Sequence, residues 1–238
     1  MDAPTLSLIV PLHNEAPNLP RLLEACVAVL ERTGESWEIL LVDDGSDDGS
    51  WDYLQHAAQG DYRVRALRHP QRLGKTQAYA TGFRAAQGHY LFTIDADLQE
   101  DPSAIPAMLA LLRQGVDMVV GWRKVRRDAP LKVLASKVFN AVLRWGLRLP
   151  LHDANCGFKG MRHEVADALL PYLERDFHRY LPLIAHRLGF RVAEVVVAHR
   201  SRLYGRSHYG LQRYGRALHD LWAVLRRLRK RNHHRVNS

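Results

Sequence analysis

Cysteine is scarce in this sequence, and long apolar runs are missing. The 238 residues include two cysteines, Cys26 and Cys156, which lie far apart in the chain. Cys26 falls within an apolar helical pattern, so we expect no disulfide framework, which favours a reducing compartment. The best candidate for a membrane span, residues 138–147, is far below the roughly 20 residues that a bilayer requires, and Asn140 and Arg144 interrupt it. We therefore expect no helix that crosses a membrane.

We also expect no secretory leader. Before the first apolar run, the N-terminal residues contain no basic region, no long apolar stretch and no small-residue cleavage site. We expect the protein to stay in the cytoplasm.

Basic residues exceed acidic ones, and the excess is confined to two segments. The whole chain has a formal net charge of +9 at pH 7. Residues 123–148 hold eight Lys and Arg against one Asp, and residues 211–238 also hold eight against one. These two segments together exceed the net charge of the chain, so the remainder is net acidic. This segregation indicates an anionic partner surface, which could be lipid or nucleic acid.

Short apolar runs alternate with helical patterns through the first half of the chain. Patterns typical of strands occur at residues 6–10, 38–42, 63–67, 90–94, 117–120 and 192–198. Helical patterns occur between them, for example at residues 19–30 and 76–86. The alternation predicts an α/β fold with a mainly parallel sheet flanked by helices, in which ligands bind at the carboxyl ends of the strands.

Polar clusters follow three of the predicted strands, where we expect them to meet at one edge of the sheet. Their members are Pro11, Asn14, Glu15, Asp43, Asp44, Asp95, Asp97 and Gln99. Asp95 and Asp97, one residue apart at a strand end, can share a hard cation such as Mg²⁺ or Mn²⁺. Such a cation would bridge the diphosphate of a nucleotide-sugar and assist departure of the nucleotide. An Asp turn that caps a helix before Pro102 remains the alternative.

The acidic loop that begins at Asp43 resembles a calcium loop only in part. The twelfth position counted from Asp44 is Gln55 rather than a bidentate Glu, and the loop follows a strand rather than a helix. Carboxylates in a loop between strand and helix favour nucleotide binding, with simple helix capping as the alternative.

Lys75 lies at a predicted helix start, next to Gly74. The segment lacks the first glycine of a phosphate-binding loop, because His69 stands in its place. Lys75 could still meet a phosphate at the helix N-terminus, and a plain surface lysine fits the pattern equally well.

Seven segments, taken in their order along the chain, form a specific pattern that extends to about Tyr209. They are IVPLHNE, LLVDDGSDDGS, LGKTQAYATGF, DADLQEDP, VGWRKVRRD, DANCGFKG and HRSRLYGRSHYG. In this order they resemble glycosyltransferase family 2, and within it the dolichyl- or polyprenyl-phosphate mannose and glucose synthases.

The resemblance implies a GT-A fold, an inverting mechanism, and a hexose donated by a nucleotide-sugar. It implies that the nucleotide-sugar is bound by Pro11, Asn14, Glu15, Asp43, Asp44, Lys75, Asp95 and Ala96. The metal, Mg²⁺ or Mn²⁺, would be held by Asp95, Asp97 and Gln99.

The resemblance also implies a polyprenyl phosphate acceptor, whose phosphate would be held by Arg123, Lys132, Ser136 and Arg202. The residues expected to act in catalysis are Asp97, Arg123 and Arg202. Lys132 stands where arginine is usual, and lysine cannot form the same bidentate fork.

We expect a catalytic domain at residues 1–210, with a basic acceptor or membrane region at 122–150, and a C-terminal amphipathic helix at 211–238. The apolar stripe of that helix comprises Leu211, Tyr214, Leu218, Leu221, Trp222, Leu225 and Leu228. A stripe flanked by arginines can lie in the headgroups of an anionic membrane, which would place the enzyme peripherally on the inner face. Packing on the catalytic domain or on a second subunit is the alternative, and the oligomeric state stays open.

Two rival functions remain. A family 2 transferase that acts on a sugar hydroxyl would need a carboxylate base, and Asp153 keeps that option open. A phosphate acceptor needs none, because it is already largely dianionic at pH 7. A nucleic-acid-binding module would fit the sequence pI of about 9.8, but the seven segments favour an enzyme without a nucleic-acid partner.

Overall fold

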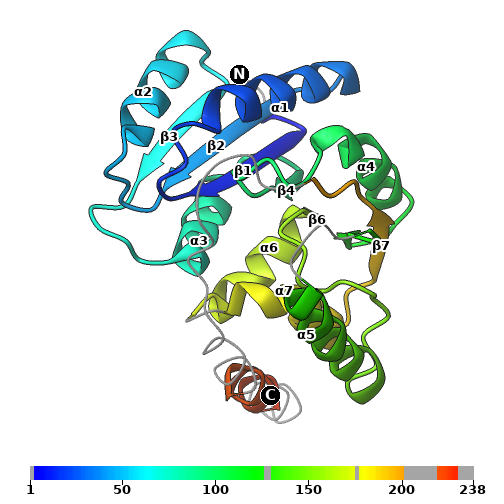
Figure 1. Ribbon diagram of the computed structural model, residues 1–238. Helices are drawn as coiled ribbons and strands as arrows, with labels where there is room; N and C mark the ends of the chain where they lie inside the picture. Colours follow the sequence, from blue (N-terminus) through cyan, green and yellow to red (C-terminus); the bar gives the residue numbers. More distant parts are fainter. Residues whose placement is uncertain (1–2, 126–129, 175–176, 201–218, 230–238) are drawn as a thin grey trace, which may run out of the picture.

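One seven-stranded sheet organises the protein in its computed structural model, which describes residues 3–125, 130–174, 177–200 and 219–229 (Figure 1). The strand order is β3-β2-β1-β4-β6-β5-β7. The strands are β1 (Leu6–Leu12), β2 (Trp37–Asp43), β3 (Val64–Arg68), β4 (Tyr90–Thr93), β5 (Met118–Trp122), β6 (Lys159–Arg162) and β7 (Val192–Val196). Only β6 is antiparallel to its described neighbours, β4 and β5. The mainly parallel sheet is confirmed, and β6 is a strand that the sequence analysis missed.

Helices cover both faces of the sheet (Figure 1). One face is covered by α1 (Leu19–Thr33), α2 (Ser50–Gly60) and α4 (Ile105–Arg113), which follows the short η1 turn (Pro102–Ala104). The other is covered by α3 (Lys75–Ala85), α6 (His163–Leu169) and α7 (Leu181–Arg187), with the short η3 (Leu170–Tyr172) and η4 (Phe177–Tyr180) turns between the last two. The reversal of strand order after β3 sends α3 to the opposite face from α1 and α2.

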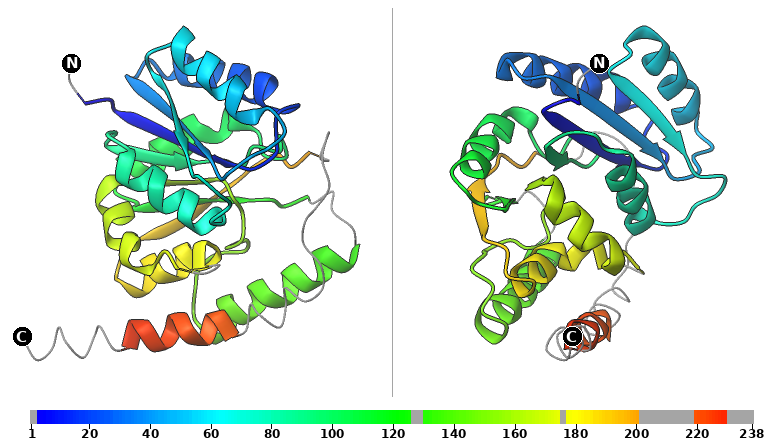
Figure 2. Two further views of the ribbon diagram at one scale, coloured as in Figure 1. Left: turned by 90° about the vertical axis from the view of Figure 1, so that its left-hand side faces the viewer. Right: turned by 180° about the vertical axis from the view of Figure 1, so that it is seen from behind.

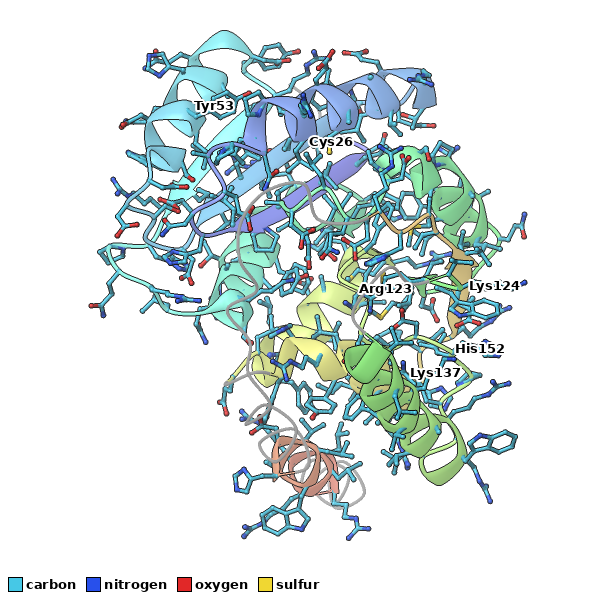
Figure 3. The ribbon with its side chains drawn as sticks, in the orientation of Figure 1. Cys26, Tyr53, Arg123, Lys124, Lys137 and His152 are labelled. Carbon is cyan, nitrogen blue, oxygen red and sulfur yellow. The ribbon has the colours of Figure 1, made fainter. Side chains whose placement is uncertain are left out.

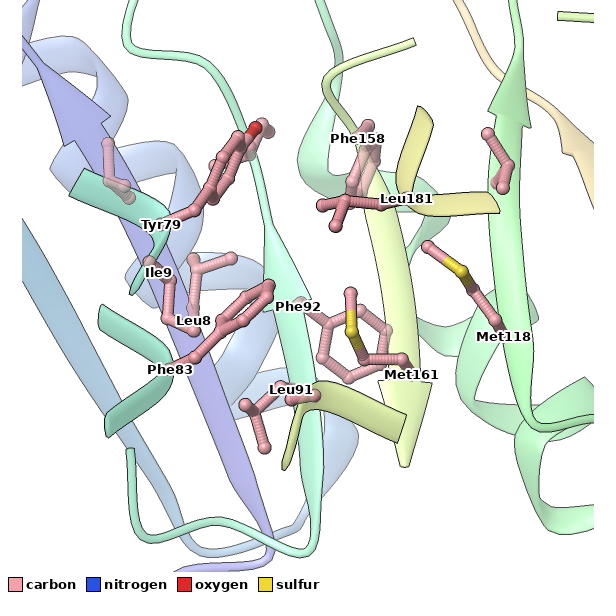
Figure 4. Close-up of a cluster of buried hydrophobic side chains, with 14 of the residues drawn as sticks. Leu8, Ile9, Tyr79, Phe83, Leu91, Phe92, Met118, Phe158, Met161 and Leu181 are labelled. Carbon is pink, nitrogen blue, oxygen red and sulfur yellow. The ribbon is translucent and has the colours of Figure 1, made fainter. Parts of the chain in front are cut away.

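The core lies on both sides of the central strands. Figure 4 shows the side chains of Ile9 and Phe83 on one side of β1 and those of Phe92 and Met161 on neighbouring β4 and β6, and all four are almost completely buried. Each such side chain contributes about 1.5–3 kcal/mol on burial. Gly82 lets α3 approach β1 closely, because a Cβ added there would lie 2.4 Å from Ile9 Cγ2.

The basic segment after β5 contains α5 (Pro130–Ala141), whose side chains are described except at 130–132 and 135, and a π-helical turn, η2 (Val142–Gly146). In both panels of Figure 2, this segment and the helix at 219–229 lie at the same lower end of the molecule. Within the described part of the chain, no helix combines the length and the apolar character needed to cross a membrane.

The helix at 219–229 packs on the body of the protein. Leu221, Val224 and Leu228 are buried and belong to the main hydrophobic cluster, and Arg227 forms an ion pair with Glu174. Trp222, by contrast, is 57% exposed. Leu221 and Leu228 of the predicted stripe therefore follow the core-packing alternative and Trp222 does not, whereas Leu211, Tyr214 and Leu218 lie outside the described residues. The division of the chain at residue 210 stays a prediction.

Candidate functional site

The loops after β1 and β2 are joined by hydrogen bonds between their polar groups. The backbone N–H of Asn14 donates to Ser46 Oγ (2.9 Å), and its side-chain amide donates to Asp47 Oδ1 (2.7 Å). The backbone N–H of Glu15 donates to Ser50 Oγ (3.1 Å). Asn14 has a positive φ of 57°, a conformation that asparagine tolerates better than most residues. The structure thus brings the first two predicted clusters together at one edge of the sheet.

Asp43 and Asp44 are both buried, and both carboxylates accept hydrogen bonds from backbone N–H groups of nearby loops. Asp43 Oδ1 accepts a hydrogen bond from the backbone N–H of Ser46 (3.0 Å), and its Oδ2 lies 3.3 Å from Arg68 Nε. Asp44 accepts backbone N–H groups with both oxygens, from Leu73 at Oδ1 and from Gly74 at Oδ2, each at 2.8 Å. Asp44 therefore fixes the loop that leads into α3.

His69 supports the same loop. Its Nδ1 lies 2.8 Å from Asp44 Oδ1, and its Nε2 lies 2.9 Å from Thr81 Oγ1 on α3. Pro11, which the resemblance assigned to the nucleotide, is a buried residue of β1 opposite Val42.

The third cluster lies at the carboxyl end of β4. Asp97 is buried and its Oδ1 accepts the backbone N–H of Gln99 (3.1 Å), and Ala96 is also buried. Leu98, between the two polar residues, has a φ of 58°. A left-handed leucine costs on the order of 1–3 kcal/mol, and such strain is concentrated at functional sites.

Asp95 faces both a lysine and a glycine. Lys75 Nζ donates to Asp95 Oδ1 at 2.5 Å. Burial alone would raise the pKa of Asp95, but the positive charges of Lys75, Lys159 and Arg123 lower it below its ordinary value, so the carboxylate is ionised. A Cβ added to Gly157 would lie 2.4 Å from Asp95 Oδ1. Gly157 is therefore required for the carboxylate to lie where it does.

The residues at this strand end suit a hard divalent cation. Among the residues that the structure describes, no group of three or more His, Cys, Asp and Glu side chains could hold a metal ion, so the donors would be the two carboxylates of Asp95 and Asp97 and the amide oxygen of Gln99. Oxygen donors of this kind are those that Mg²⁺ and Mn²⁺ prefer. Next to them, the buried Glu100 Oε2 has no hydrogen-bond partner within the described residues.

Arg123, labelled near the centre of the molecule in Figure 3, is buried against two carboxylates. Its side chain is 11% exposed. Nε and Nη2 donate to the two oxygens of Asp153, at 2.8 and 3.1 Å, and Nη1 lies 3.8 Å from Glu100 Oε1. Arg123 is thus held in a bidentate ion pair with Asp153, and its expected contact with an acceptor phosphate stays a prediction.

Glu100 and Lys159 carry shifted pKa values next to this ion pair. Burial and the charge of Asp95 raise the pKa of Glu100 to about 8 in spite of the nearby Arg123. Burial lowers the pKa of Lys159 to about 8, and its ammonium group donates to the backbone carbonyl of Cys156. Concentrated shifts of this kind are typical of functional sites.

The segment after β7 is hydrogen-bonded to the loop after β4, which carries the candidate metal ligands. Glu100 and His199 form an antiparallel β-bridge, and the backbone N–H of Arg200 donates to the carbonyl of Gln99 (2.8 Å). Arg200 also pairs with Asp101, with Nη2 at 2.5 Å from Oδ2. The chain that leads to Arg202 therefore starts at the site, although Arg202 itself lies outside the described residues.

The remaining residues predicted for the acceptor lie on α5. Lys132 belongs to α5, but its side chain is outside the described set. Ser136 Oγ lies 3.5 Å from Asn140 Nδ2, and Asn140 Oδ1 accepts the backbone N–H of Ala154 (3.3 Å). Because Ala154 is adjacent to Asp153, α5 is connected to the loop that holds Arg123.

Glu100, Lys159 and His69 lie at the site but were not predicted from the sequence. Glu100 directly follows the Asp95 cluster, and Lys159 stands in the DANCGFKG segment, so their positions beside recognised motifs were the available signal. Their burial could not be predicted from the sequence, because most charged side chains lie at the surface.

Residues 7–170 match the family described as glycosyl transferase family 2. An undecaprenyl-phosphate 4-deoxy-4-formamido-L-arabinose transferase from Proteus mirabilis is 34% identical over 221 residues, which cover 92% of this chain and 67% of that protein. The protein of the same name from Pectobacterium atrosepticum is 32% identical over 225 residues, with coverage of 94% and 68%.

Solved structures share the fold. Glucosyl-3-phosphoglycerate synthase from Mycobacterium tuberculosis, in complex with Mn²⁺, UDP and phosphoglyceric acid, superposes with a TM-score of 0.67 at 21% identity, covering 94% of this chain and 78% of that one. A mannosyltransferase from Pyrobaculum calidifontis, in complex with GDP-Man and Mn²⁺, gives a TM-score of 0.59 at 18% identity, covering 86% and 59%. These similarities confirm the predicted GT-A fold.

Proposed function

Because the chain belongs to glycosyl transferase family 2, we propose that it transfers a sugar from a nucleoside-diphosphate sugar to a polyprenyl phosphate at an anionic membrane surface, with the help of Mg²⁺ or Mn²⁺. The observation that carries the proposal is the 34% identity over 92% of the chain to an undecaprenyl-phosphate transferase. The relatives are named for an arabinose derivative, so the expectation of a hexose is one option among the sugars to be tested.

The donor would lie across the carboxyl ends of β1, β2 and β4. The loops after β1 and β2, joined by the hydrogen bond between Asn14 and Asp47, would hold the nucleoside. The diphosphate would lie next to Lys75 and Asp95, at the carboxyl end of β4. A divalent cation bound by Asp95, Asp97 and Gln99 would neutralise the charge that develops on the leaving diphosphate. Solved neighbours of the same fold were crystallised with Mn²⁺ or Mg²⁺ and nucleotides, which supports the use of a divalent cation and a nucleotide.

The acceptor phosphate needs positive charge rather than a base. A phosphomonoester is already largely dianionic at pH 7, and its approach to a diphosphate in a site of low dielectric must be offset by cations. The bonds to Asp153 use one donor each of Nε and Nη2 of Arg123, whereas a guanidinium has five. Arg123 can thus be held rigidly by Asp153 and still donate to a phosphate, together with Arg202, Lys132 and Ser136.

Asp153 is a poor candidate for the base that a sugar-hydroxyl acceptor would need. Both of its oxygens accept hydrogen bonds from Arg123, and the residue is 3% exposed. A general base must reach the proton that it removes. This ion pair favours a phosphate acceptor over the rival reaction.

The lower end of the molecule carries the surface that would meet the membrane. Leu134, Val138, Val142 and Trp145, three or four residues apart on α5 and η2, are 60%, 58%, 43% and 78% exposed. An exposed apolar stripe on a helix, flanked here by the exposed Lys137, Arg144 and Arg148, is the pattern of a helix that lies in anionic headgroups. Trp222 adds an exposed aromatic ring from the helix at 219–229.

The test is transfer from labelled nucleotide-sugars to a short polyprenyl phosphate, with Mn²⁺ or Mg²⁺, followed by partition into organic solvent. The panel should include UDP- and GDP-linked hexoses and UDP-linked 4-deoxy-4-formamido-L-arabinose. We expect one donor to give a lipid-soluble product that mild acid releases as free sugar. Label that appears only in products with a sugar hydroxyl as acceptor, and never in the lipid phosphate, would overturn the proposal in favour of its rival.

A further inference from the structure

Lys75 forms an ion pair with Asp95, whose carboxylate would bind the proposed metal. It is the first residue of α3, and its Nζ lies 2.5 Å from Asp95 Oδ1. The two side chains are 26% and 25% exposed, so the pair lies at the rim of the site and can rearrange when a ligand arrives.

The position of Lys75 is built into the fold rather than left to a mobile side chain alone. Gly74, which precedes α3, has a φ of 95°, and its backbone N–H is held by Asp44 Oδ2 at 2.8 Å. The backbone N–H of Leu73 is held by the other oxygen of Asp44. Asp44 therefore positions the start of α3, and with it the ammonium group opposite Asp95.

An ammonium group and a divalent cation compete for the same oxygen. Asp95 also feels the positive charges of Lys159 and Arg123, so a cation that arrives alone meets a site already balanced by nearby positive charge. A diphosphate changes this balance, because it offers Lys75 a second anionic partner at the N-terminus of α3, where the helix dipole favours a negative charge.

We propose that Lys75 is an internal counter-ion for Asp95 that leaves this carboxylate for the donor diphosphate, so that metal and nucleotide bind cooperatively. The inference rests on the proposed function, because it takes Asp95 as a metal ligand. Metal alone binds weakly, since it must displace Lys75. With the diphosphate present, Lys75 turns toward the new anion and Asp95 becomes accessible to the metal. The coupling is reciprocal, so metal must raise the affinity for the nucleotide by the same factor.

The test measures binding rather than turnover. The affinity for Mn²⁺ is determined by the electron paramagnetic resonance signal of free Mn²⁺, for the full chain, with and without saturating UDP or GDP. We expect Lys75→Met to bind Mn²⁺ alone about five- to tenfold more tightly than the wild-type chain, and to lose most of the enhancement that the nucleoside diphosphate gives. Lys75→Arg, which keeps the charge, should retain the enhancement.

Arg84→Met is the matched control. Arg84 is exposed in the last turn of the same helix, so the substitution removes the same unit of charge away from Asp95, and it should leave Mn²⁺ affinity unchanged. Lys75→Met that binds Mn²⁺ with wild-type affinity and full nucleotide enhancement would overturn the counter-ion role but leave the proposed function intact. Failure of every protein to bind Mn²⁺, even with UDP and GDP, would instead overturn the metal assignment and the counter-ion role together.

Discussion

The two halves of the site use polar residues in different ways. In the half built on β1 and β2, short polar side chains bond to backbone N–H groups of the facing loop, as Asn14 does with Asp47. In the half built on β5 and β6, full charges are buried against each other, as Arg123 is against Asp153 and Glu100. The first arrangement fixes the shape of the two loops, whereas the second concentrates charge next to the proposed acceptor site.

The ion pair of the second half should contribute most to stability. We expect Asp153→Asn to lower the free energy of unfolding by about 3–5 kcal/mol, because it leaves the buried Arg123 charge without its bidentate partner. Asp61→Asn is the matched control, since Asp61 binds Arg63 with similar geometry (Nε at 3.0 Å, Nη2 at 2.8 Å) but about 30% exposed, and it should cost about 0–1 kcal/mol. Equal losses of stability in urea unfolding would show that burial of the pair between Arg123 and Asp153 adds nothing to its contribution.

Enzymatic activity should be most sensitive to loss of charge at the end of β4, between the two halves. We expect Asp97→Asn to lower kcat at saturating Mn²⁺ by about a hundredfold or more, because a metal ligand supplies several kcal/mol of charge stabilisation. The volume is unchanged, so the thermal unfolding curve should stay close to that of the wild-type chain. Near-normal turnover would show that Asp97 only caps the turn before Pro102.

The apolar stripe on α5 predicts a smaller effect on membrane binding. We expect Trp145→Ser to weaken sedimentation with phosphatidylglycerol-containing vesicles about fivefold, which corresponds to about 1 kcal/mol for a partly inserted side chain. Tyr62→Ser is the control, because Tyr62 is 76% exposed but lies between α2 and β3. If both substitutions had the same effect, α5 would not be the docking surface.

A further prediction concerns the pH dependence of stability. Lys159 has a pKa of about 8 in the folded protein, against 10.5 as its ordinary value. Between pH 8 and 10.5 the unfolded chain keeps a proton on Lys159 that the folded protein has released. The folded state therefore becomes more stable as the pH rises through this range. Below pH 8 the free-energy cost of burying the charged ammonium group is fully present. Lys159→Met should lack this rise in unfolding experiments at pH 8 to 10, whereas the exposed Lys137→Met should keep it.

The sequence was sufficient to predict the alternation of strands and helices, because the apolar runs at 6–10 and 38–42 are nearly continuous, as in strands buried on both faces. It did not predict β6, since the segment KGMR (159–162) has no apolar run and is a strand only because β4 and β5 bond to it. The metal-binding candidates follow from motif order, whereas the partners of Arg123 and Asp44 depend on contacts between residues about 30 positions apart. Such contacts are set by the tertiary fold rather than by local pattern.

The sheet order also determines when the protein can fold during its synthesis. Strands β1 to β4 are complete once residue 93 has left the ribosome, but β4 receives its second neighbour only with residues 159–162, and β5 receives β7 only with residues 192–196. Until then, the nascent chain exposes an unpaired edge of buried-type strand residues, which is prone to intermolecular pairing. Slow closure of these long loops makes the interval between β4 and β6 the stage at which a chaperone would improve the yield of folded enzyme.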